Sequence, residues 1–369
     1  MQTAAQFEAE ARRYKHLNGA TLETQSPSMT AAAGVQSVPF LAADVGGTHA
    51  RIGLVSATGD CAQPVALLRY ATYECARFPS LGEILRAFLF DHVLAPVYCG
   101  SIACAGYPEG EQVINTNLPW PVSLSELRAA LGVRELALIN DFQAMACATE
   151  FLRADDTTLL AGPAVAASGP VLVMGPGTGL GAAVRIPALN GRSIILSTEA
   201  GQAAFAPSTP RELAILDRLL RESSHVPVEQ LVSGPGLHTI YRTLGLIEGS
   251  PTPLESPARI TAAAIAGDDV LARDALDTFC GLLGSVVGDS ILLYGAQAGC
   301  FWRAASCRRC ASFLQHSSFH ARLLSKGPMR SVLAQVPVRL IEHGNLGVIG
   351  AASWFLQHRS GVLSVKDRM

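Results

Sequence analysis

Two glycine-rich stretches decide the fold class of this chain: Asp44-Val-Gly-Gly-Thr-His-Ala-Arg51 and Gly175-Pro-Gly-Thr-Gly-Leu-Gly181. Each follows an apolar run, Val38-Pro-Phe-Leu-Ala-Ala43 before the first and Val171-Leu-Val-Met174 before the second. A strand that ends in glycines presents successive backbone N–H groups to an anion, because glycine reaches unusual dihedrals and lets a phosphate approach closely. One such loop alone is also typical of a tight hairpin. Two loops, each opening one half of the chain, predict a nucleotide held between two similar lobes.

Length and composition indicate a well-buried protein of two domains. The 369 residues exceed what a single hydrophobic core usually supports. Hydrophobic residues make up 49% and charged residues 16% of the chain, and the formal net charge is −2. That charge gives no bias toward polyanions, so we expect no nucleic-acid partner. The longest apolar stretch, Phe279–Tyr294, contains Asp289 and several glycines, so we expect no membrane span.

The cysteines and the first residues both favour a cytoplasmic protein. Nine cysteines are scattered along a chain too long to need disulfide staples, which predicts reduced thiols. Residues 1–37 are rich in Ser, Thr, Ala and Gln and lack the apolar core of a signal peptide. We expect a flexible N-terminal leader over 1–37, with Met1 or Met29 as the start of translation.

From Phe40 onward, strand-like and helix-like patterns alternate, which predicts an α/β protein with a mixed sheet in each half. From Arg211 the pattern is mostly helical. The expected strands are Phe40–Ala43, Ile52–Val55, Val65–Tyr73, Tyr98–Ala103, Leu136–Ile139, Val171–Met174 and Ala182–Ile186, and the expected helices include Leu81–Asp91 and Phe142–Phe151.

Six separated motifs resemble those of the bacterial glucokinases, a family of the actin/hexokinase-like superfamily. They are Asp44-Val-Gly-Gly-Thr48, Thr116-Asn-Leu-Pro-Trp120, Asn140-Asp-Phe142, Gly175-Pro-Gly-Thr-Gly-Leu-Gly181, Glu199-Ala-Gly-Gln202 and Ser233-Gly-Pro-Gly-Leu237. The resemblance extends from about Phe40 to Phe355. It implies a two-lobed actin/hexokinase-like (ribonuclease H-like) fold, with a mixed β-sheet in each lobe and a deep cleft between the lobes. The expected divisions are a small lobe over 38–151, a large lobe over 152–345, and a C-terminal helix in 346–369 that returns to the small lobe.

Asp141 is the expected catalytic base. Sugar phosphorylation needs a base near the attacking hydroxyl, and phosphoryl transfer otherwise depends on positioning and charge neutralisation. A carboxylate that follows a buried strand and opens a helix is held in place. The resemblance implies that Asp141 is this base and that Asn140 binds the sugar. The alternative is that Asp141 serves only as a helix N-cap.

Several further polar residues are expected to bind the sugar, because a polyol is recognised through satisfied hydrogen bonds. The resemblance assigns this task to Asn117, Glu199 and Glu229, whose alternative is to be ordinary surface groups. The family usually has a histidine where this chain has Gln202. We therefore expect Gln202 to contact the substrate too, and a hexose is expected more firmly than glucose itself.

The expected cofactors are ATP and Mg²⁺. The resemblance implies that Asp44 positions the metal and that the two glycine loops bind the phosphates. A single carboxylate suffices chemically, because Mg²⁺ takes few protein ligands besides water and phosphate oxygens. Neither a Walker-type loop nor a protein-kinase signature is present in the sequence. The loop residues expected to bind the nucleotide are Gly46, Gly47, Thr48, Gly177, Thr178 and Gly179.

Between Gln297 and Cys310 the resemblance is lost, although it is good on both sides. The family has an apolar strand and a glycine pair here, as part of the adenosine pocket, whereas this chain has Cys300-Phe-Trp-Arg-Ala-Ala-Ser-Cys-Arg-Arg-Cys310. Arg303 is expected in the middle of a buried strand, where an unpaired charge is costly. One interpretation is a damaged adenosine pocket. The three cysteines lack a second ligand pair, and no Cys-rich motif follows Glu199, so we expect no structural metal.

A second interpretation of this segment is a pair of compensating frameshifts, one near 295–299 and one near 310–313. Translated one frame over, codons for these residues permit Phe-Leu-Ala-Gly-Gly-Ile-Leu-Pro, the kind of strand and glycine turn that the fold needs. Resequencing decides between the two interpretations, and a peptide mass that matched the printed residues would exclude a reading error.

Taken together, the resemblance implies ATP-dependent phosphorylation of a hexose at its 6-hydroxyl, with D-glucose the expected substrate, and a homodimer as the assembly. Two alternatives stay open: a non-catalytic sugar-binding or regulatory homologue with a damaged adenine pocket, and a kinase for a different hexose.

Overall fold

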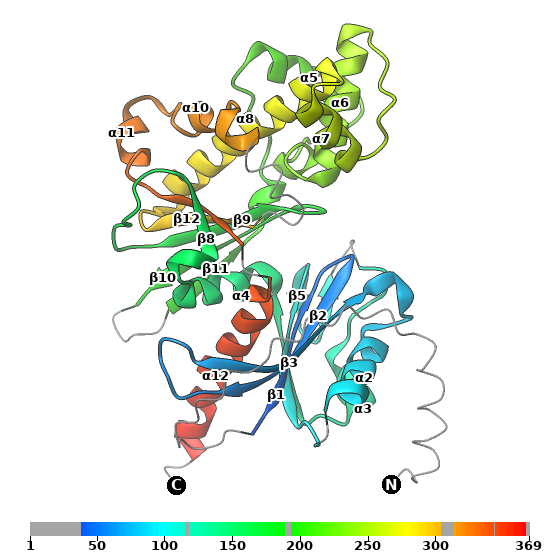
Figure 1. Cartoon of the computed structure of the whole chain (residues 1–369), viewed down its shortest axis with the longest axis vertical. Coiled ribbons are helices and arrows are strands. Elements are labelled where there is room, and N and C mark those ends of the chain that lie inside the picture. Colours follow the sequence, from blue (N-terminus) through cyan, green and yellow to red (C-terminus); the bar gives the residue numbers. More distant parts are fainter. Residues whose placement is uncertain are drawn as a thin grey trace. The chain divides into compact units, whose positions relative to one another are not determined.

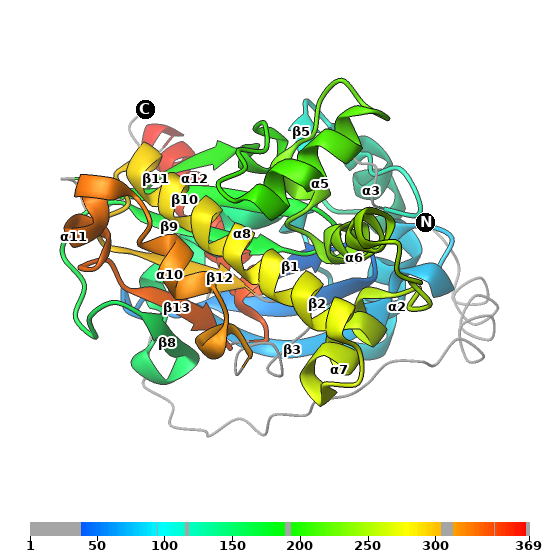
Figure 2. The ribbon, with the colours of Figure 1, turned by 90° about the horizontal axis from the view of Figure 1, so that it is seen from above.

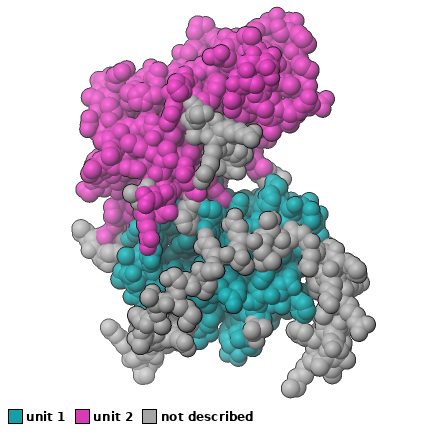
Figure 3. All heavy atoms as spheres, in the orientation of Figure 1, with its two compact units in different colours: residues 1–151, 344–369 teal, residues 152–343 magenta. Residues whose placement is uncertain are grey.

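The computed structural model describes residues 38–93, 95–114, 118–188, 193–303, 313–342 and 344–366. The chain divides into two compact units (Figure 3). Unit 1 comprises Met1–Phe151 and Gly344–Met369, and unit 2 comprises Leu152–His343.

Unit 1 is built on a mixed five-stranded sheet with the order β3-β2-β1-β4-β7. Strand β1 pairs antiparallel with β2 and parallel with β4, β2 pairs antiparallel with β3, and β4 pairs parallel with β7. A small hairpin of β5 and β6 lies outside this sheet. The strands are β1 Phe40–Val45, β2 His49–Ala57, β3 Val65–Glu74, β4 Cys99–Cys104, β5 Tyr107–Glu109, β6 Gln112–Ile114 and β7 Glu135–Asn140.

Helices cover both faces of this sheet (Figure 1). Because strand side chains alternate, Leu41 and Ala43 of β1 join the core under α2 and α3, while Phe40 and Ala42 pack against α12. The long helix α12 also packs on α4, and a Cβ added at Gly350 would lie 1.8 Å from the carbonyl oxygen of Ala144, so only glycine fits that crossing. The helices are α2 Leu81–His92, α3 Leu124–Leu131, α4 Asp141–Ala148 and α12 Leu346–Lys366, with 3-10 turns η1 Cys75–Arg77 and η2 Thr149–Phe151.

Unit 2 is built on a mixed six-stranded sheet with the order β11-β10-β9-β12-β13-β8. The first five strands in this order repeat the order and directions of the sheet in unit 1. Strand β10 pairs antiparallel with both β11 and β9, and β12 pairs parallel with both β9 and β13. The expected α/β fold with a mixed sheet in each half is therefore confirmed. The strands are β8 Thr157–Ala161, β9 Val171–Pro176, β10 Leu180–Pro187, β11 Ser193–Thr198, β12 Gly299–Arg303 and β13 Val338–Ile341.

The central helix of unit 2 is α8, which contacts α6, α7 and α10 (Figures 1 and 2). It is long and apolar enough to cross a membrane by composition alone, but 67% of its most apolar window is buried in the structure, as in a core helix. Its glycines bring α10 close, because a Cβ at Gly284 would lie 2.2 Å from the carbonyl oxygen of Phe319. The helices are α5 Pro210–Leu220, α6 Gly234–Glu248, α7 Pro257–Ala266, α8 Val270–Tyr294, α10 Phe319–Leu323 and α11 Arg330–Leu333, with 3-10 turns η3 Ala154–Asp156, η4 Ala200–Gln202, η5 Val228–Gln230 and η6 Gly327–Met329.

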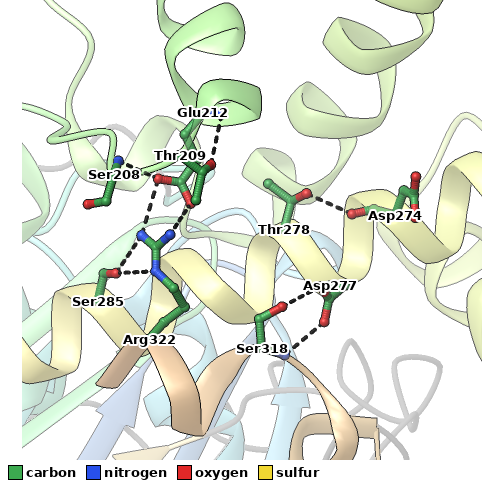
Figure 4. A network of polar contacts seen from close by, with 9 residues as sticks. All are labelled: Ser208, Thr209, Glu212, Asp274, Asp277, Thr278, Ser285, Ser318 and Arg322. Carbon is green, nitrogen blue, oxygen red and sulfur yellow. Dashed lines mark hydrogen bonds and ion pairs between the residues drawn. The ribbon is translucent and has the colours of Figure 1, made fainter. Parts of the chain in front are cut away.

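A polar network ties α5, α8 and α10 together (Figure 4). The guanidinium of Arg322 lies 3.0 Å from Oε1 of the buried Glu212 and donates to Oγ of Ser285 at 2.8 Å. Glu212 also accepts a hydrogen bond from the backbone N–H of Ser208. In the same region, Asp277 accepts from the backbone N–H of Ser318 at 2.8 Å. The charges of Arg322 and Glu212 are thus paired where burial would make either one alone costly.

Candidate functional site

The first glycine loop joins β1 to β2 in unit 1. Asp44, one residue before the end of β1, is only 2% exposed. The loop is held by the 3-10 turn that follows β3, because the N–H of Cys75 donates to the carbonyl oxygen of Thr48 at 2.9 Å and its thiol to that of Gly46 at 3.3 Å. Gly46 and Gly47 are half-buried and Thr48 is exposed.

The carboxylate of Asp44 has neighbours that the sequence did not indicate. Nη1 of Arg51 lies 3.4 Å from its Oδ2 atom. A Cβ added at Gly347, in the first turn of α12, would lie 2.5 Å from the same oxygen. The N-terminal turn of α12 therefore packs directly on Asp44, where its partial positive charge favours a carboxylate.

Asn140 and Asp141 lie where β7 meets α4. The N-cap of α4 is Asn140: its Oδ1 accepts from the N–H groups of Phe142 and Gln143, and Gln143 completes a capping box. Its Nδ2 donates to the carbonyl oxygen of Gly106 at 3.0 Å. Asp141 is the first residue of the helix and is half-buried. Asn140 is therefore the N-cap of α4, and Oδ1 of Asp141 accepts from the N–H of Phe142 as well, at 3.0 Å. Among the described residues the amide of Asn140 donates one hydrogen bond, so its second N–H is available to a ligand.

The carboxylates of Asp44 and Asp141 lie at the same edge of the sheet. Strands β1, β4 and β7 are parallel neighbours, and Asp44, Cys104 and Asn140 lie at or next to their carboxyl ends. Burial raises the pKa of the Cys104 thiol, and the negative charges of Asp141 and then Asp44 raise it further. This thiol therefore stays protonated at neutral pH, beneath the edge where ligands bind in open α/β sheets.

The second glycine loop, between β9 and β10 in unit 2, repeats the first in its burial. Gly177 and Gly179 are half-buried and Thr178 is exposed, as are their counterparts in unit 1. The N–H of Gly177 donates to the carbonyl oxygen of Gly179, and the N–H of Gly234, at the start of α6, donates to that of Gly177, both at 2.8 Å.

Two of the loop glycines, Gly175 and Gly179, are needed for space, whereas a Cβ at Gly177 would have nothing within 4 Å. The expectation that they adopt angles reserved for glycine is wrong, because neither Gly177 nor Gly179 has a positive φ. A Cβ at Gly179 would instead lie 2.6 Å from Oε2 of Glu229, and one at Gly175 would lie 2.2 Å from the carbonyl oxygen of Arg303. A neighbouring strand and a neighbouring side chain thus require glycine at positions 175 and 179.

Three of the expected sugar-binding residues gather beside the second loop. Nε2 of Gln202 donates to Oε1 of Glu229 at 2.7 Å, and the backbone N–H of Leu180 donates to Oε2 at 3.1 Å. Glu199 is exposed, and its pKa is raised by partial burial and then by the negative charge of Glu229. The remaining expected sugar contact, Asn117, lies outside the described residues.

Strand β12 forms in the segment where the resemblance is lost. Residues Gly299–Arg303 pair with β9 on one side and β13 on the other. Arg303, which was expected in the middle of this strand, is half-buried and is the last described residue before position 313, so its place within the strand stays an expectation. The misfit is Trp302, which is 5% exposed and whose indole N–H has no hydrogen-bond partner within the described part of the chain. Cys307, Cys310 and most of the proposed frameshifted segment lie outside that part.

Sequence reasoning missed Cys75, Arg51 and Gly347. Cys75 and Gly347 contact residues that are distant in sequence. The one local signal was the glycine in the first turn of the last helix, which indicates a close approach of another group to that turn. Among the described residues, no group of three or more His, Cys, Asp or Glu side chains is placed to hold a metal ion.

Comparisons by sequence and by structure both find glucokinases. The glucokinase family model matches residues 41–358. A glucokinase-like protein of Xylella fastidiosa strain 9a5c is 47% identical over 322 residues, which cover 87% of this chain and 96% of the relative. A glucokinase of Stenotrophomonas maltophilia strain R551-3 is 38% identical over 323 residues, 86% of this chain and 95% of the relative. The crystal structure of a glucokinase from an Antarctic psychrotroph matches with a TM-score of 0.74 at 34% identity, covering 86% of this chain and 99% of that one.

Two units with the same sheet order, each with a glycine loop after its first central strand, define a sugar kinase with the two-lobed actin/hexokinase-like fold. The similarity to solved and curated relatives covers nearly all of the chain beyond residue 40. The chain belongs to the glucokinase family.

Proposed function

We propose that this protein transfers the γ-phosphoryl group of ATP to the 6-hydroxyl of a hexose, with D-glucose as the substrate. One observation carries the proposal beyond family membership: in unit 2, Gln202 and Glu229 form a hydrogen-bonded pair directly against the second glycine loop. Groups suited to hydroxyls and a loop suited to phosphates therefore meet in one place.

In this proposal, the residues of unit 2 hold the sugar. The carboxylates of Glu199 and Glu229 accept hydrogen bonds from sugar hydroxyls, and the amide of Gln202 donates or accepts beside them. Each carboxylate oxygen offers two lone pairs, so the contacts of Glu229 to Gln202 and Leu180 leave acceptor capacity for a hydroxyl. Asn117 and the remaining N–H of Asn140 complete the sugar contacts of the proposal.

Asp141 acts as the base that takes the proton from the attacking hydroxyl. Its backbone is fixed because α4 is capped by the preceding residue, Asn140. General bases of this kind contribute roughly 10²- to 10⁴-fold to the rate.

The glycine loops bind the phosphates, through Gly46, Gly47 and Thr48 in unit 1 and Gly177, Thr178 and Gly179 in unit 2. Asp44 would hold Mg²⁺ directly or through water, and the donor set fits this ion, which accepts a single protein carboxylate. When bound, the ion would neutralise charge on the transferred phosphoryl group. Arg51 and the first turn of α12 keep Asp44 in place.

The test is a panel of hexoses with ATP and coupled detection of ADP, on protein whose mass confirms the printed sequence. We expect the highest kcat/KM with D-glucose, and phosphorylation at the 6-position by NMR. A clear preference for another hexose would reassign the substrate. Folded protein that releases no ADP with any hexose would overturn the proposal.

A second candidate, a sugar-binding relative without catalysis, is favoured by one observation. Trp302 is buried in the strand that the family uses near the adenosine, and its indole N–H has no hydrogen-bond partner among the residues that the structure describes. Calorimetry separates the candidates: the kinase binds both glucose and a non-hydrolysable ATP analogue, whereas the sugar-binding relative binds glucose alone.

The assembly and location also belong to this proposal. We place the enzyme in the cytoplasm as a homodimer, without a nucleic-acid or membrane partner. Size-exclusion chromatography with light scattering tests the assembly, and a monomer mass near 38.8 kDa would contradict it.

A further inference from the structure

Glu229 is in contact with the backbone of the second glycine loop. Its Oε2 atom accepts the N–H of Leu180, the residue that follows Gly179, at 3.1 Å. A Cβ at Gly179 would lie 2.6 Å from the same oxygen. A carboxylate is a strong acceptor for a backbone N–H, so this contact orients the peptide that leaves the loop.

The carboxylate is held from the other side by the η4 turn. Nε2 of Gln202 donates to Oε1 at 2.7 Å. A Cβ at Gly201 would lie 2.5 Å from the carbonyl oxygen of Leu180 and 3.2 Å from Oε2 of Glu229. The loop, the carboxylate and η4 therefore form one layer in which two glycines permit the close approach.

The backbone beneath Glu229 is fixed as well. Ala204 and Pro227 form an antiparallel bridge, and the N–H of Val228 donates to the carbonyl oxygen of Ala203 at 2.8 Å. These contacts join η4 to η5, the turn that carries Glu229. The position of its carboxylate is therefore set by the fold before any ligand binds.

We propose that Glu229 is a positioning residue for the second glycine loop, and that Gln202 holds it in that role. The inference rests on the proposed function for the identities of sugar and nucleotide, and it gives Glu229 a task beyond contact with the sugar. In the free protein, Glu229 holds the Leu180 peptide so that the loop is formed before the nucleotide arrives. A sugar hydroxyl that donates to Glu229 then acts on the loop within unit 2 itself.

A carboxylate that served the sugar alone would not affect the loop while no sugar is present. The experiment is therefore done without sugar, on the full chain. Two quantities are measured: hydrogen exchange of the peptide that contains the Leu180 amide, and the affinity for AMPPNP with Mg²⁺. The variants are Glu229→Ala, Glu229→Gln and Gln202→Leu, with Glu199→Ala as the matched control.

Glu199 is a suitable control because it belongs to the same proposed sugar site, yet its carboxylate makes no hydrogen bond to the loop among the described residues. We expect Glu229→Ala to speed exchange at Leu180 and to weaken AMPPNP binding, each by roughly tenfold, the scale of a hydrogen bond to a charged group. Gln202→Leu shifts both in the same direction by less. Glu229→Gln, which keeps an oxygen acceptor, recovers most of the loss, and Glu199→Ala stays within about twofold of the wild type.

Unchanged exchange at Leu180 in Glu229→Ala would overturn the proposal, as would an equal effect of Glu199→Ala. A melting temperature of Glu229→Ala that is not below that of the wild type shows that a loss is not general unfolding. If the wild type itself fails to bind AMPPNP, the proposed function fails, and the exchange measurement still decides whether Glu229 positions the loop.

Discussion

Gly347 lies directly against Asp44: a Cβ at position 347 would come within 2.5 Å of both the carboxyl carbon and Oδ2. The two residues are separated by most of the sequence, yet the first turn of α12 forms one wall around the carboxylate that the proposal assigns to the metal. A methyl group there must displace either α12 or Asp44.

Gly347→Ala should therefore impair both stability and turnover. Overpacking of this kind costs about 1–3 kcal/mol, and we expect kcat/KM for the Mg²⁺–ATP complex to fall at least tenfold. The control is Gly344→Ala, because a Cβ at Gly344 has nothing within 4 Å. Steady-state kinetics and thermal melting measure both effects, and equal behaviour of the two variants would show that Asp44 does not depend on α12.

Asp141→Asn should separate catalysis from folding. The helix cap is Asn140, so the loss of the Asp141 charge near the N-terminus of α4 costs at most about 1 kcal/mol. Turnover should fall by roughly 10²- to 10⁴-fold. Near-normal kcat in the variant would remove Asp141 from the role of base.

Asn140→Ala should destabilise the protein more than Asp141→Asn does. It removes the side-chain acceptor for the N–H of Gln143, one of two acceptors for the N–H of Phe142, and the bond to Gly106, so we expect unfolding to be easier by about 1–2 kcal/mol. Urea unfolding followed by circular dichroism measures the change. A loss no larger than that of Asp141→Asn would contradict the capping assignment.

Arg322→Ala should destabilise unit 2 strongly. It leaves the carboxylate of Glu212, whose side chain is 4% exposed, without its charge partner, at a cost of about 3–5 kcal/mol. Arg221→Ala is the matched control, because the pair of Arg221 and Asp217 is 68% and 69% exposed and should contribute below about 1 kcal/mol. Similar urea midpoints for the two variants would contradict the importance of burial here.

Glu199 should make stability depend on pH. Partial burial and then the charge of Glu229 raise its pKa, so the folded state binds this proton more tightly than the unfolded state. Its destabilising contribution appears as the pH rises from the ordinary pKa through the raised one, and it is fully present above that range. Glu199→Gln should therefore melt at a higher temperature than the wild type at pH 7, with the difference shrinking toward pH 4. A difference that is constant with pH would contradict this cause.

The strands near the glycine loops were predictable because their signal is local. The apolar runs at Phe40–Ala43 and Val171–Met174 became β1 and β9, each extended by two residues into the loop. Alternation and β-branched content suffice for such strands.

Contacts distant in sequence were not predictable. Gln202 and Glu229 were expected to contact the sugar. Their mutual hydrogen bond depends on the contact between η4 and η5, which no local sequence pattern predicts. The sequence did not decide between Asn140 and Asp141 as the N-cap, because Asn and Asp cap helices about equally well. The structure makes Asn140 the N-cap because its backbone has the extended conformation that a cap requires. Strand β12 formed despite its unusual sequence because β9 and β13 supply backbone partners on both sides.

The most direct test of the central claim is NMR of the purified, mass-verified protein incubated with glucose, ATP and Mg²⁺. We expect ADP and glucose 6-phosphate to accumulate in equal amounts, and both to form roughly 10²- to 10⁴-fold more slowly with Asp141→Asn. Protein that binds glucose but forms neither product would contradict this claim.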